Sequence, residues 1–325
     1  MKAAIFEQPS KSLVIGERDD PRIVENEMLL RVRYCGICGT DIHASREGPF
    51  MAPPGTVFGH EFAGEIIEIG GGISSDQFSI GERVTSLPFI GDKTIGLGDV
   101  DGGYAELVKV DYQQAVKLPD TIDDVQGALV EPMAVGLHSV KMADSVAGKK
   151  VLIIGAGPIG LACAIWCRFF GADRVVISEF SETRIRIAEG IGFTEFISPD
   201  QDVGAEFTSL TGAEPAVQFE CVGAPGMLQS CIERAPARGV VMGIGVCDSP
   251  DSITPLLAFM KELRMQWAVG YDKADFEFAI EMMTQGRLEP MPMVTDIISL
   301  DQVPEFFEQL RQPSSQCKVL IDLLK

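Results

Sequence analysis

Short apolar runs separated by turn residues predict a β-rich region at the start of the chain. The runs are rich in β-branched or aromatic residues, and they include Leu13–Ile15, Met28–Tyr34, Phe62–Ile69 and Tyr104–Val110. Residues 85–103 hold five glycines, one proline and three aspartates, so we expect a surface loop there.

A different pattern begins near Ala128, where helical stretches alternate with apolar strands. The strands expected in this region are Val151–Ile154, Arg174–Ile177, Val217–Glu220 and Gly239–Met242. Alternating β and α units predict a parallel sheet covered by helices on both faces, so the fold class is α/β. After Tyr271 the pattern predicts an amphipathic helix, and the chain ends in an apolar strand at Cys317–Ile321.

The size and charge of the chain narrow the possible functions. At 325 residues the chain is long enough for two domains. Its formal charge of −20 and its pI of about 4.5 argue against nucleic acid and against an anionic membrane as partners. We find no secretory signal and no apolar run typical of a membrane span, and eight cysteines are too few for a disulfide scaffold. These features predict a cytoplasmic protein.

A glycine-rich turn directly follows the predicted strand Val151–Ile154. Its sequence, Gly155–Gly160, has the G-x-G-x-x-G spacing, and a helix is expected from Leu161 to Phe170. In such a turn the first glycine permits the bend, the second lets the backbone approach a pyrophosphate, and the third lets the helix pack closely on the strand. The free N–H groups at the start of the helix can bind phosphate, so we predict a dinucleotide site here.

The end of the next strand indicates which dinucleotide binds. Glu179 lies nineteen residues after Gly160, where an acidic side chain would accept a hydrogen bond from a ribose 2′-hydroxyl. A carboxylate at this point repels a 2′-phosphate, so NAD is favoured over NADP. Arg184 is close enough in the sequence to keep NADP as the less favoured alternative. The competing interpretation of Glu179 is a solvated side chain at a strand end.

Potential metal ligands gather in one stretch of the β-rich region. His43 and His60, two of the three histidines in the chain, fall within eighteen residues of each other. Cys38, Asp41 and Glu61 lie in or beside the same stretch. One thiolate, one imidazole and one carboxylate can hold zinc and leave a position open, which is typical of a catalytic zinc site.

The pair Cys35 and Cys38 forms a C-x-x-C, which elsewhere indicates a zinc ribbon or a redox pair. The chain has no second C-x-x-C to complete a ribbon, and the thioredoxin-like context is missing. A mixed site with one of these thiols is the remaining alternative, and composition cannot choose between Cys35 and Cys38.

Several longer motifs resemble the successive signatures of the zinc-containing medium-chain dehydrogenases. The motifs are Gly36–His43, Gly59–Gly64, Gly102–Glu106, Glu131–His138, Phe219–Gly223 and Gly239–Gly243. They span nearly the whole chain in the right order and spacing. Within that family the chain is most similar to the branch that holds sorbitol, butanediol and threonine dehydrogenases.

The resemblance implies the metal ligands. Cys38 and His60 would bind zinc, and Glu61 and Glu131 occupy positions that bind zinc directly or through its water. Asp41 would orient the His60 ring. The resemblance does not decide which glutamate is the direct ligand.

The resemblance also implies the catalytic and cofactor residues. Zinc would polarise the alcohol, hydride would pass to the nicotinamide, and the proton would leave from Thr40 through the cofactor ribose to His43. A helix N-cap is the structural alternative for Thr40. Glu61 completes the predicted catalytic set. The predicted cofactor-binding residues are Gly155, Gly157, Pro158, Ile159, Gly160, Glu179, Arg184, Cys221, Val222 and Gly243.

One segment departs from the family pattern. Members with a second, structural zinc carry four closely spaced cysteines beyond the turn that is Gly81–Val84 here, whereas Thr85–Gly103 contains no cysteine. We therefore expect one catalytic zinc and no structural zinc. Cys35 is expected to be a core residue, and His138 is expected to be structural.

As a whole, the resemblance implies a GroES-like β-rich catalytic domain and a Rossmann domain with a doubly wound parallel sheet. We expect the catalytic domain at residues 1–137 and 272–325 and the NAD-binding domain at 138–271. The expected activity is reversible hydride transfer between a secondary alcohol or polyol and NAD. The alternatives are a zinc-free quinone-oxidoreductase-type reductase of the same fold and a non-catalytic nucleotide-binding protein.

Substrate and assembly are weakly specified by the sequence. A partly apolar pocket is expected from Ser45, Phe50, Met51, Leu87, Phe89 and Phe259. By analogy with relatives that pair the edge strands of their cofactor sheets, we expect a homodimer or homotetramer with a contact at Leu263–Ala268.

Overall fold

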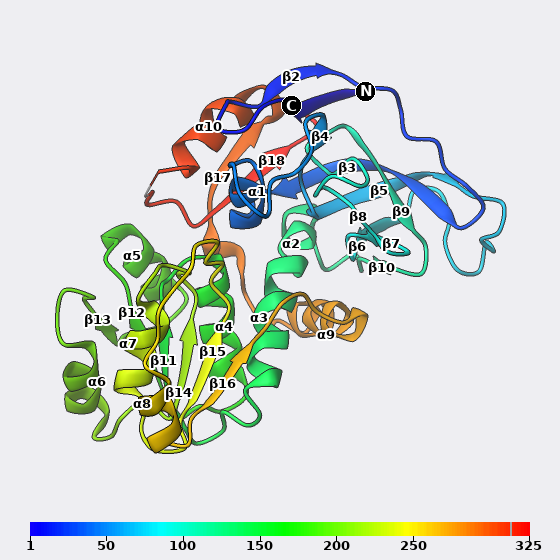
Figure 1. Ribbon diagram of the computed structural model, residues 1–325. Helices are drawn as coiled ribbons and strands as arrows, with labels where there is room; N and C mark the ends of the chain where they lie inside the picture. Colours follow the sequence, from blue (N-terminus) through cyan, green and yellow to red (C-terminus); the bar gives the residue numbers. More distant parts are fainter. Residues whose placement is uncertain (313) are drawn as a thin grey trace. The chain divides into compact units, whose positions relative to one another are not determined.

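The computed structural model describes residues 1–312 and 314–325 (Figure 1). The chain divides into two units. Unit 1 contains Met1–Glu131 and Phe276–Lys325, and unit 2 contains Pro132–Asp275. Unit 2 is therefore an insertion between two segments of unit 1.

Unit 1 is built on β-sheets, as its alternating apolar runs predict. A three-stranded sheet has the order β2-β1-β4, and a seven-stranded sheet has the order β10-β6-β5-β3-β18-β17 with β9 also paired to β3. The strands are β1 Lys2–Phe6, β2 Val14–Glu17, β3 Glu27–Gly36, β4 Thr56–Val57, β5 Glu61–Ile69, β6 Arg83–Ser86, β9 Leu107–Asp111, β10 Ala115–Lys117, β17 Val294–Ser299 and β18 Lys318–Asp322.

Short helices complete unit 1. They are α1 Gly39–Ala44, α2 Asp124–Ala128 and α10 Val303–Leu310, with 3₁₀ turns η1 Met291–Met293 and η2 Leu300–Gln302. Two further helices, α3 Val130–Met142 and α9 Lys273–Thr284, contain the points at which the chain passes between the units.

An aromatic group forms the centre of the unit 1 core. The ring of Phe58 lies 5.4 Å from that of Phe6 and 6.0 Å from that of Phe307, measured between centroids. All three side chains are fully buried. Phe307 belongs to α10, so the C-terminal segment contributes directly to the core beside the N-terminal strands.

The segment predicted as a surface loop is more ordered than expected. Within residues 85–103, β7 Phe89–Ile90 pairs with β8 Lys93–Thr94 in a hairpin, and Ile95 is fully buried. Gly96 packs against the backbone of Gly59, where a Cβ would lie only 2.5 Å from the Gly59 carbonyl oxygen. The glycines of this segment therefore serve close backbone packing at its base.

The predicted strand at Tyr104–Val110 begins three residues later, with β9 at Leu107. The N–H of Tyr104 instead donates to the carbonyl of Phe58 at 2.9 Å, and that of Gly103 donates to Gly59 at 2.8 Å. These bonds hold the segment against the chain just before β5, which places Tyr104 beside the candidate site.

Unit 2 contains a six-stranded parallel sheet with the order β13-β12-β11-β14-β15-β16. The strands are β11 Lys150–Ile154, β12 Arg174–Ser178, β13 Phe196–Ile197, β14 Val217–Glu220, β15 Val240–Gly243 and β16 Arg264–Trp267. The helices are α4 Pro158–Phe169, α5 Glu182–Gly190, α6 Val203–Thr211, α7 Met227–Arg234 and α8 Pro255–Met260. This strand order is that of the doubly wound fold, in which ligands bind at the carboxyl ends of the strands where the order reverses.

Helix α4 of unit 2 is largely buried. It packs against β11, β12 and β14, and its residues from Gly160 to Cys167 are buried. The indole Nε1 of Trp166 donates to the carbonyl of Met133 at 2.8 Å, which ties α4 to α3. In the described residues, no helix combines the length and apolar character needed to cross a membrane.

Candidate functional site

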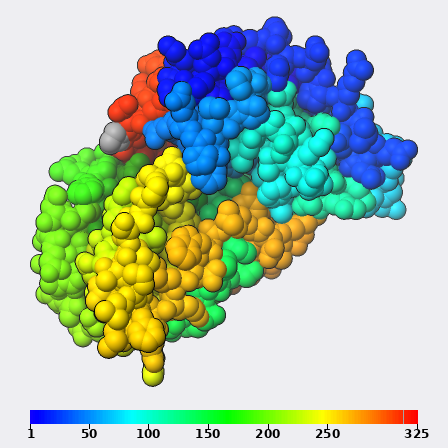
Figure 2. Space-filling view, in the orientation of Figure 1, coloured from blue at the N-terminus to red at the C-terminus, as the bar shows by residue number. Residues whose placement is uncertain are grey.

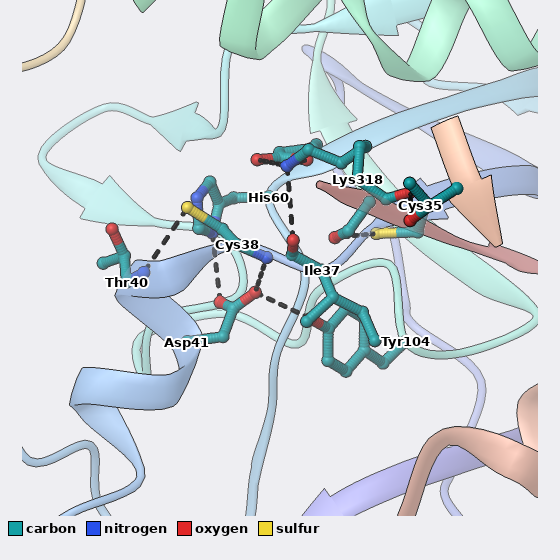
Figure 3. A network of polar contacts seen from close by, with 11 residues as sticks. Cys35, Ile37, Cys38, Thr40, Asp41, His60, Tyr104 and Lys318 are labelled. Carbon is teal, nitrogen blue, oxygen red and sulfur yellow. Dashed lines mark hydrogen bonds and ion pairs between the residues drawn. The ribbon is translucent and has the colours of Figure 1, made fainter. Parts of the chain in front are cut away.

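Cys38 lies at the start of α1, immediately after β3. Its Sγ accepts a hydrogen bond from the N–H of Thr40 at 3.4 Å, and the Oδ2 of Asp41 accepts one from the N–H of Cys38 at 3.1 Å (Figure 3). Cys38 is thus the N-cap of α1, whereas Thr40 lies inside the helix. The structural alternative for Thr40, an N-cap, is wrong because the thiol already has that position.

Asp41 connects His60 to Tyr104. The Nδ1 of His60 lies 3.2 Å from the Oδ1 of Asp41, and the hydroxyl of Tyr104 donates to the Oδ2 of Asp41 at 2.7 Å. Asp41 and Tyr104 are fully buried, and His60 is nearly so. Burial alone would lower the pKa of His60, but Asp41 and Cys38 raise it well above its usual value. The Asp41 carboxylate and the Cys38 side chain therefore favour a positive charge at the His60 ring.

Glu61 lies next to His60 and forms a buried ion pair that the sequence analysis missed. The Nζ of Lys318 donates to both carboxylate oxygens of Glu61, at 2.7 and 2.6 Å. Both side chains are almost completely buried. Burial would lower the pKa of Lys318, but Glu61, Cys38 and Glu131 raise it above its usual value. The only sequence signal was one lysine in the otherwise apolar run at the C-terminus.

Three of the four predicted metal ligands come together. One ligand atom each from Cys38, His60 and Glu61 lies within 4.8 Å of the others. Glu131, at the second position of α3, is buried but does not join this group. A soft thiolate, an imidazole nitrogen and a carboxylate oxygen form a donor set suited to zinc, so these residues fit the metal that the sequence implies.

Cys35 is not part of this group of potential ligands. Its thiol is fully buried and donates weakly to the carbonyl of Gly36 at 3.7 Å. A Cβ at Gly59 or at Gly103 would lie 2.8 Å from its Sγ, so glycine at both positions makes room for the sulfur. Burial raises the pKa of the Cys35 thiol well above its usual value. The expectation that Cys35 is a core residue is confirmed.

Thr40 and His43, the predicted proton route, both lie on α1 and both are half-buried. A spacing of three residues places them on neighbouring positions of one helix face. Both residues therefore lie on the helix that Cys38 caps.

The glycine-rich turn of unit 2 has the geometry that its sequence predicts. Gly155 has a φ of +92°, and a Cβ at Gly160 would lie 1.9 Å from the carbonyl oxygen of Gly155. No atom lies within 4 Å of a Cβ placed on Gly157, so the turn is open there. Pro158 and Ile159 are the first residues of α4, whose N-cap is Gly157. Open backbone at the start of a helix can receive a phosphate group.

The other predicted cofactor residues lie at the carboxyl ends of neighbouring strands. Glu179 follows β12, and its carboxylate accepts hydrogen bonds from the N–H groups of Ala156, Phe180 and Ser181 at 2.8, 2.8 and 2.9 Å. The Nη1 of Arg184 lies 4.0 Å from Glu179. The glutamate is therefore a fixed, buried charge beside the glycine turn, which excludes the solvated interpretation.

Cys221 and Val222 follow β14, and Gly243 is the last residue of β15. A Cβ on Gly155 would lie 2.9 Å from a side-chain atom of Val222, so Val222 lies directly beside the glycine turn. All these residues therefore lie at the same edge of the parallel sheet as the turn.

A second group of potential ligands contains His138, Asp272 and Asp275. Asp275 accepts a hydrogen bond from Lys141 at 2.7 Å and one from the N–H of Asp272 at 2.9 Å, and it contacts His138 at 3.1 Å. Its charge is already neutralised by the lysine. His138 thus ties α3 to the start of α9, which agrees with a structural role.

Comparisons with known proteins match both parts of the chain. A family model described as an alcohol dehydrogenase GroES-like domain matches residues 24–120, and one described as a zinc-binding dehydrogenase matches residues 158–285. The chain is 31% identical to (R,R)-butanediol dehydrogenase of Bacillus subtilis, with 99% of each protein covered. It is 29% identical to sorbitol dehydrogenase of Gallus gallus, covering 95% of this chain and 93% of that protein.

Solved structures show the same similarity. The crystal structure of 2R,3R-butanediol dehydrogenase from Bacillus subtilis has a TM-score of 0.89 and 31% identity over 99% of both chains. A zinc-binding dehydrogenase from Sinorhizobium meliloti 1021, bound to NADP, also has a TM-score of 0.89, with 29% identity over 99% of both chains. The motifs, the fold and the comparisons therefore point to one family.

Proposed function

This chain belongs to the zinc-binding alcohol and polyol dehydrogenases, and from that premise we propose that it transfers hydride reversibly between a secondary alcohol or polyol and NAD. One observation carries the proposal. Cys38, His60 and Glu61 bring three ligand atoms of the right chemical types within 4.8 Å of one another. Unit 2 adds a glycine turn suited to a dinucleotide.

We propose one catalytic zinc and no structural zinc. Cys38, His60 and Glu61 would hold the metal directly, and Glu131 would bind it through the water in the fourth position. Asp41 fixes the orientation of the His60 ring, and Tyr104 holds Asp41 in place through its 2.7 Å hydrogen bond. When bound, zinc supplies a Lewis acid that polarises the substrate oxygen.

Two residues of α1 are proposed to move the proton released by the alcohol. Thr40 offers a hydroxyl that can both accept and donate, and His43 offers an imidazole whose ring nitrogens can take up and release a proton. Thr40 and His43 are both half-buried, so a proton released inside the site could pass through them to the solvent. Glu61 contributes to catalysis by holding charge close to the reacting oxygen.

We propose NAD as the preferred cofactor. The carboxylate of Glu179 is fixed by three backbone N–H groups at the end of β12. A negative charge fixed at this place accepts a hydrogen bond from a 2′-hydroxyl and repels a 2′-phosphate. Arg184, 4.0 Å away, is the feature that favours NADP, and the relative from Sinorhizobium meliloti is bound to NADP. Activity with both cofactors must therefore be compared.

The substrate pocket is proposed from residues with differing exposure. Leu87 is buried and Phe89 is half-buried, whereas Phe50 is exposed. Met51 is also exposed, and the buried hydroxyl of Ser45 donates to the carbonyl of Ile42 at 2.8 Å. This apolar character supports a small uncharged alcohol or polyol as the substrate class.

A homodimer or homotetramer in the cytoplasm is proposed as the working form. The segment Leu263–Ala268 contains β16, an edge strand of the parallel sheet, on which Trp267 is 56% exposed. Phe259 and Met260 of α8 are exposed nearby in sequence, and the atoms of this yellow-to-orange segment lie at the surface (Figure 2). Exposed apolar residues beside the free edge of a sheet favour association of two chains. The eight free cysteines suit a reducing compartment.

The test combines a metal measurement with a substrate screen. Purified protein is analysed for zinc and then assayed with secondary alcohols and polyols, following NADH or NADPH formation by absorbance. We expect about one zinc per chain and turnover with NAD that exceeds turnover with NADP. Enone reduction without zinc would favour the zinc-free reductase, and nucleotide binding without turnover of any alcohol would favour the non-catalytic protein.

A further inference from the structure

Lys318 places a positive charge inside the candidate metal centre. It is the first residue of β18, and its side chain is only 1% exposed. Its Nζ donates to Oε1 and Oε2 of Glu61 at 2.7 and 2.6 Å, and to the carbonyl of Ile37 at 3.2 Å (Figure 3). An ammonium has three donors and no acceptor, so these contacts use its full hydrogen-bonding capacity.

The sheet register explains how Lys318 reaches Glu61. In the pairing of β18, β3 and β5, Leu320 lies opposite Gly36, and Gly36 lies opposite Glu61. Alternate residues of a strand share a face, so Lys318 lies on the same face as Leu320. A Cβ on Gly36 would lie 1.9 Å from the Oε2 of Glu61. The ion pair therefore spans β3 through space that exists because residue 36 is glycine.

The acidic groups around the site outnumber the charges of a divalent metal. A Cys38 thiolate and the carboxylates of Glu61 and Glu131 would carry three negative charges, and the buried carboxylate of Asp41 lies beside His60. The ammonium of Lys318, paired directly with Glu61, offsets part of this excess in surroundings where an unpaired charge is costly.

We propose that Lys318 is a positioning residue that allows Glu61 to offer only one oxygen to the metal. This inference rests on the metal site of the proposed function. Both oxygens of Glu61 could turn to the metal only if both left Lys318, whose buried ammonium would then lose its charged partner. With one oxygen from Glu61, a thiolate from Cys38 and a nitrogen from His60, a four-coordinate metal retains one open position for substrate.

Cobalt substitution tests this inference directly. Co²⁺ replaces zinc in such sites, and its visible d–d bands are intense in four-coordinate sites and weak when the coordination number is higher. We expect intense bands in the wild-type protein. In K318M the bands should fall by at least about twofold, because Glu61 becomes free to bind through both oxygens. K318R, which retains a buried cation with several donors, should restore the wild-type spectrum.

Two further variants separate positioning from general stability. In K109M a lysine is lost that also bonds both oxygens of a buried glutamate, Glu27, at 2.9 and 3.0 Å in the same sheet. K109M should keep the wild-type cobalt spectrum. In the double variant K318M/E61Q neither charge remains, so no buried charge is left unpaired, and the band intensity should recover because an amide binds a metal through its one oxygen.

The outcomes distinguish this inference from the proposed function. If wild-type protein takes up no cobalt or zinc, the metal centre itself is wrong. If wild-type protein binds one cobalt but already shows weak bands, or if K318M binds cobalt with unchanged bands, the role of Lys318 is wrong. A loss of intensity in K318M that persists in K318M/E61Q also overturns it, because the effect would not pass through Glu61. Should K318M not fold, K318Q takes its place, because one amide group cannot replace the ammonium that bonds both oxygens of Glu61, and unchanged bands in K318Q would then overturn the role of Lys318.

Discussion

The two cysteines of the C-x-x-C segment have different surroundings, and this difference predicts different effects of substitution. Cys38 lies with His60 and Glu61 in the candidate metal centre, whereas Cys35 is fully buried in the hydrophobic core of unit 1. We expect Cys38→Ala or His60→Ala to lower zinc content to below about one tenth per chain and to remove dehydrogenase activity, because two ligands hold a metal far less tightly than three. Metal analysis and NADH formation measure the two effects.

Cys35→Ala is the matched control. It removes one buried sulfur from the core and should lower stability by roughly 1–2 kcal/mol while zinc content stays near that of the wild type. Full zinc retention in both Cys38→Ala and His60→Ala would disprove the ligand assignment. If Cys35→Ala folds normally but loses its zinc, the thiol ligand would be Cys35 and the assignment to Cys38 would be wrong.

The residues of the candidate site differ in how well their roles can be predicted from the sequence. Cys38, His60 and Glu61 could be predicted because their motifs are local and their chemistry is distinctive. Tyr104 and Lys318 could not be assigned from residue type, because each acts through a partner more than forty residues away in the chain, Asp41 and Glu61 respectively. Only the pairing of distant strands brings such residues together.

At the scale of secondary structure, the junction between α3 and α9 depends on one buried carboxylate. Asp275 has no exposed side-chain surface and contacts both Lys141 and His138 of α3. Burial acts to raise the pKa of Asp275, but Lys141, the N–H of Asp272 and His138 together lower it below its usual value of 3.8. A lowered pKa means that the ionised form stabilises the folded state.

We therefore expect Asp275→Asn to destabilise the protein in a pH-dependent way. Stability from a carboxylate with a lowered pKa is fully present above its ordinary pKa and is lost as the pH falls through the lowered value. The variant should lose about 1–3 kcal/mol at neutral pH, and its difference from the wild type should narrow below about pH 4. Urea unfolding at several pH values measures both.

A surface ion pair provides the control for this junction. Asp144 pairs with Arg264, but its side chain is 71% exposed. Asp144→Asn should change stability by about 0.5 kcal/mol or less at every pH, because water screens exposed pairs. Equal effects of the two substitutions would show that burial of Asp275 does not matter.

Secondary-structure elements were predicted well where the pattern is strong and local. The strands that became β11, β12, β14 and β15 were expected within one residue of their bounds, since each is a short apolar run. The hairpin of β7 and β8 was missed because glycines and aspartates indicate turns in the same way whether the backbone around them is exposed or buried. In residues 85–103, contacts with Gly59 decided the outcome, and these lie outside any local window.

At the scale of the whole chain, the units depend on pairings that no local pattern specifies. The C-terminal run Cys317–Ile321 was recognisable as a strand, but its pattern fits either unit. In the structure β18 pairs with β3 and β17, and this pairing brings Lys318 to Glu61. The candidate metal centre of unit 1 is therefore built from segments almost as far apart as the chain allows.

This division of the chain predicts that metal removal affects the two activities of the protein differently. The candidate ligands Cys38, His60 and Glu61 belong to unit 1, and the turn Gly155–Gly160 belongs to unit 2. Treatment with a chelator should abolish alcohol oxidation and lower the unfolding temperature, since zinc at about one hundred times its Kd contributes roughly 2.7 kcal/mol to the folded state. NADH binding, followed by cofactor fluorescence, should stay within about threefold of the untreated protein, because the glycine turn that would receive the pyrophosphate is formed by residues of unit 2 alone. Adding zinc back should restore both activity and unfolding temperature.

Chelator treatment of Cys38→Ala should change neither the unfolding temperature nor NADH binding, since that variant has no metal to lose. Loss of NADH binding together with zinc would contradict the independence of the two sites, because it would mean that the metal supports the fold of unit 2 as well as the chemistry of unit 1.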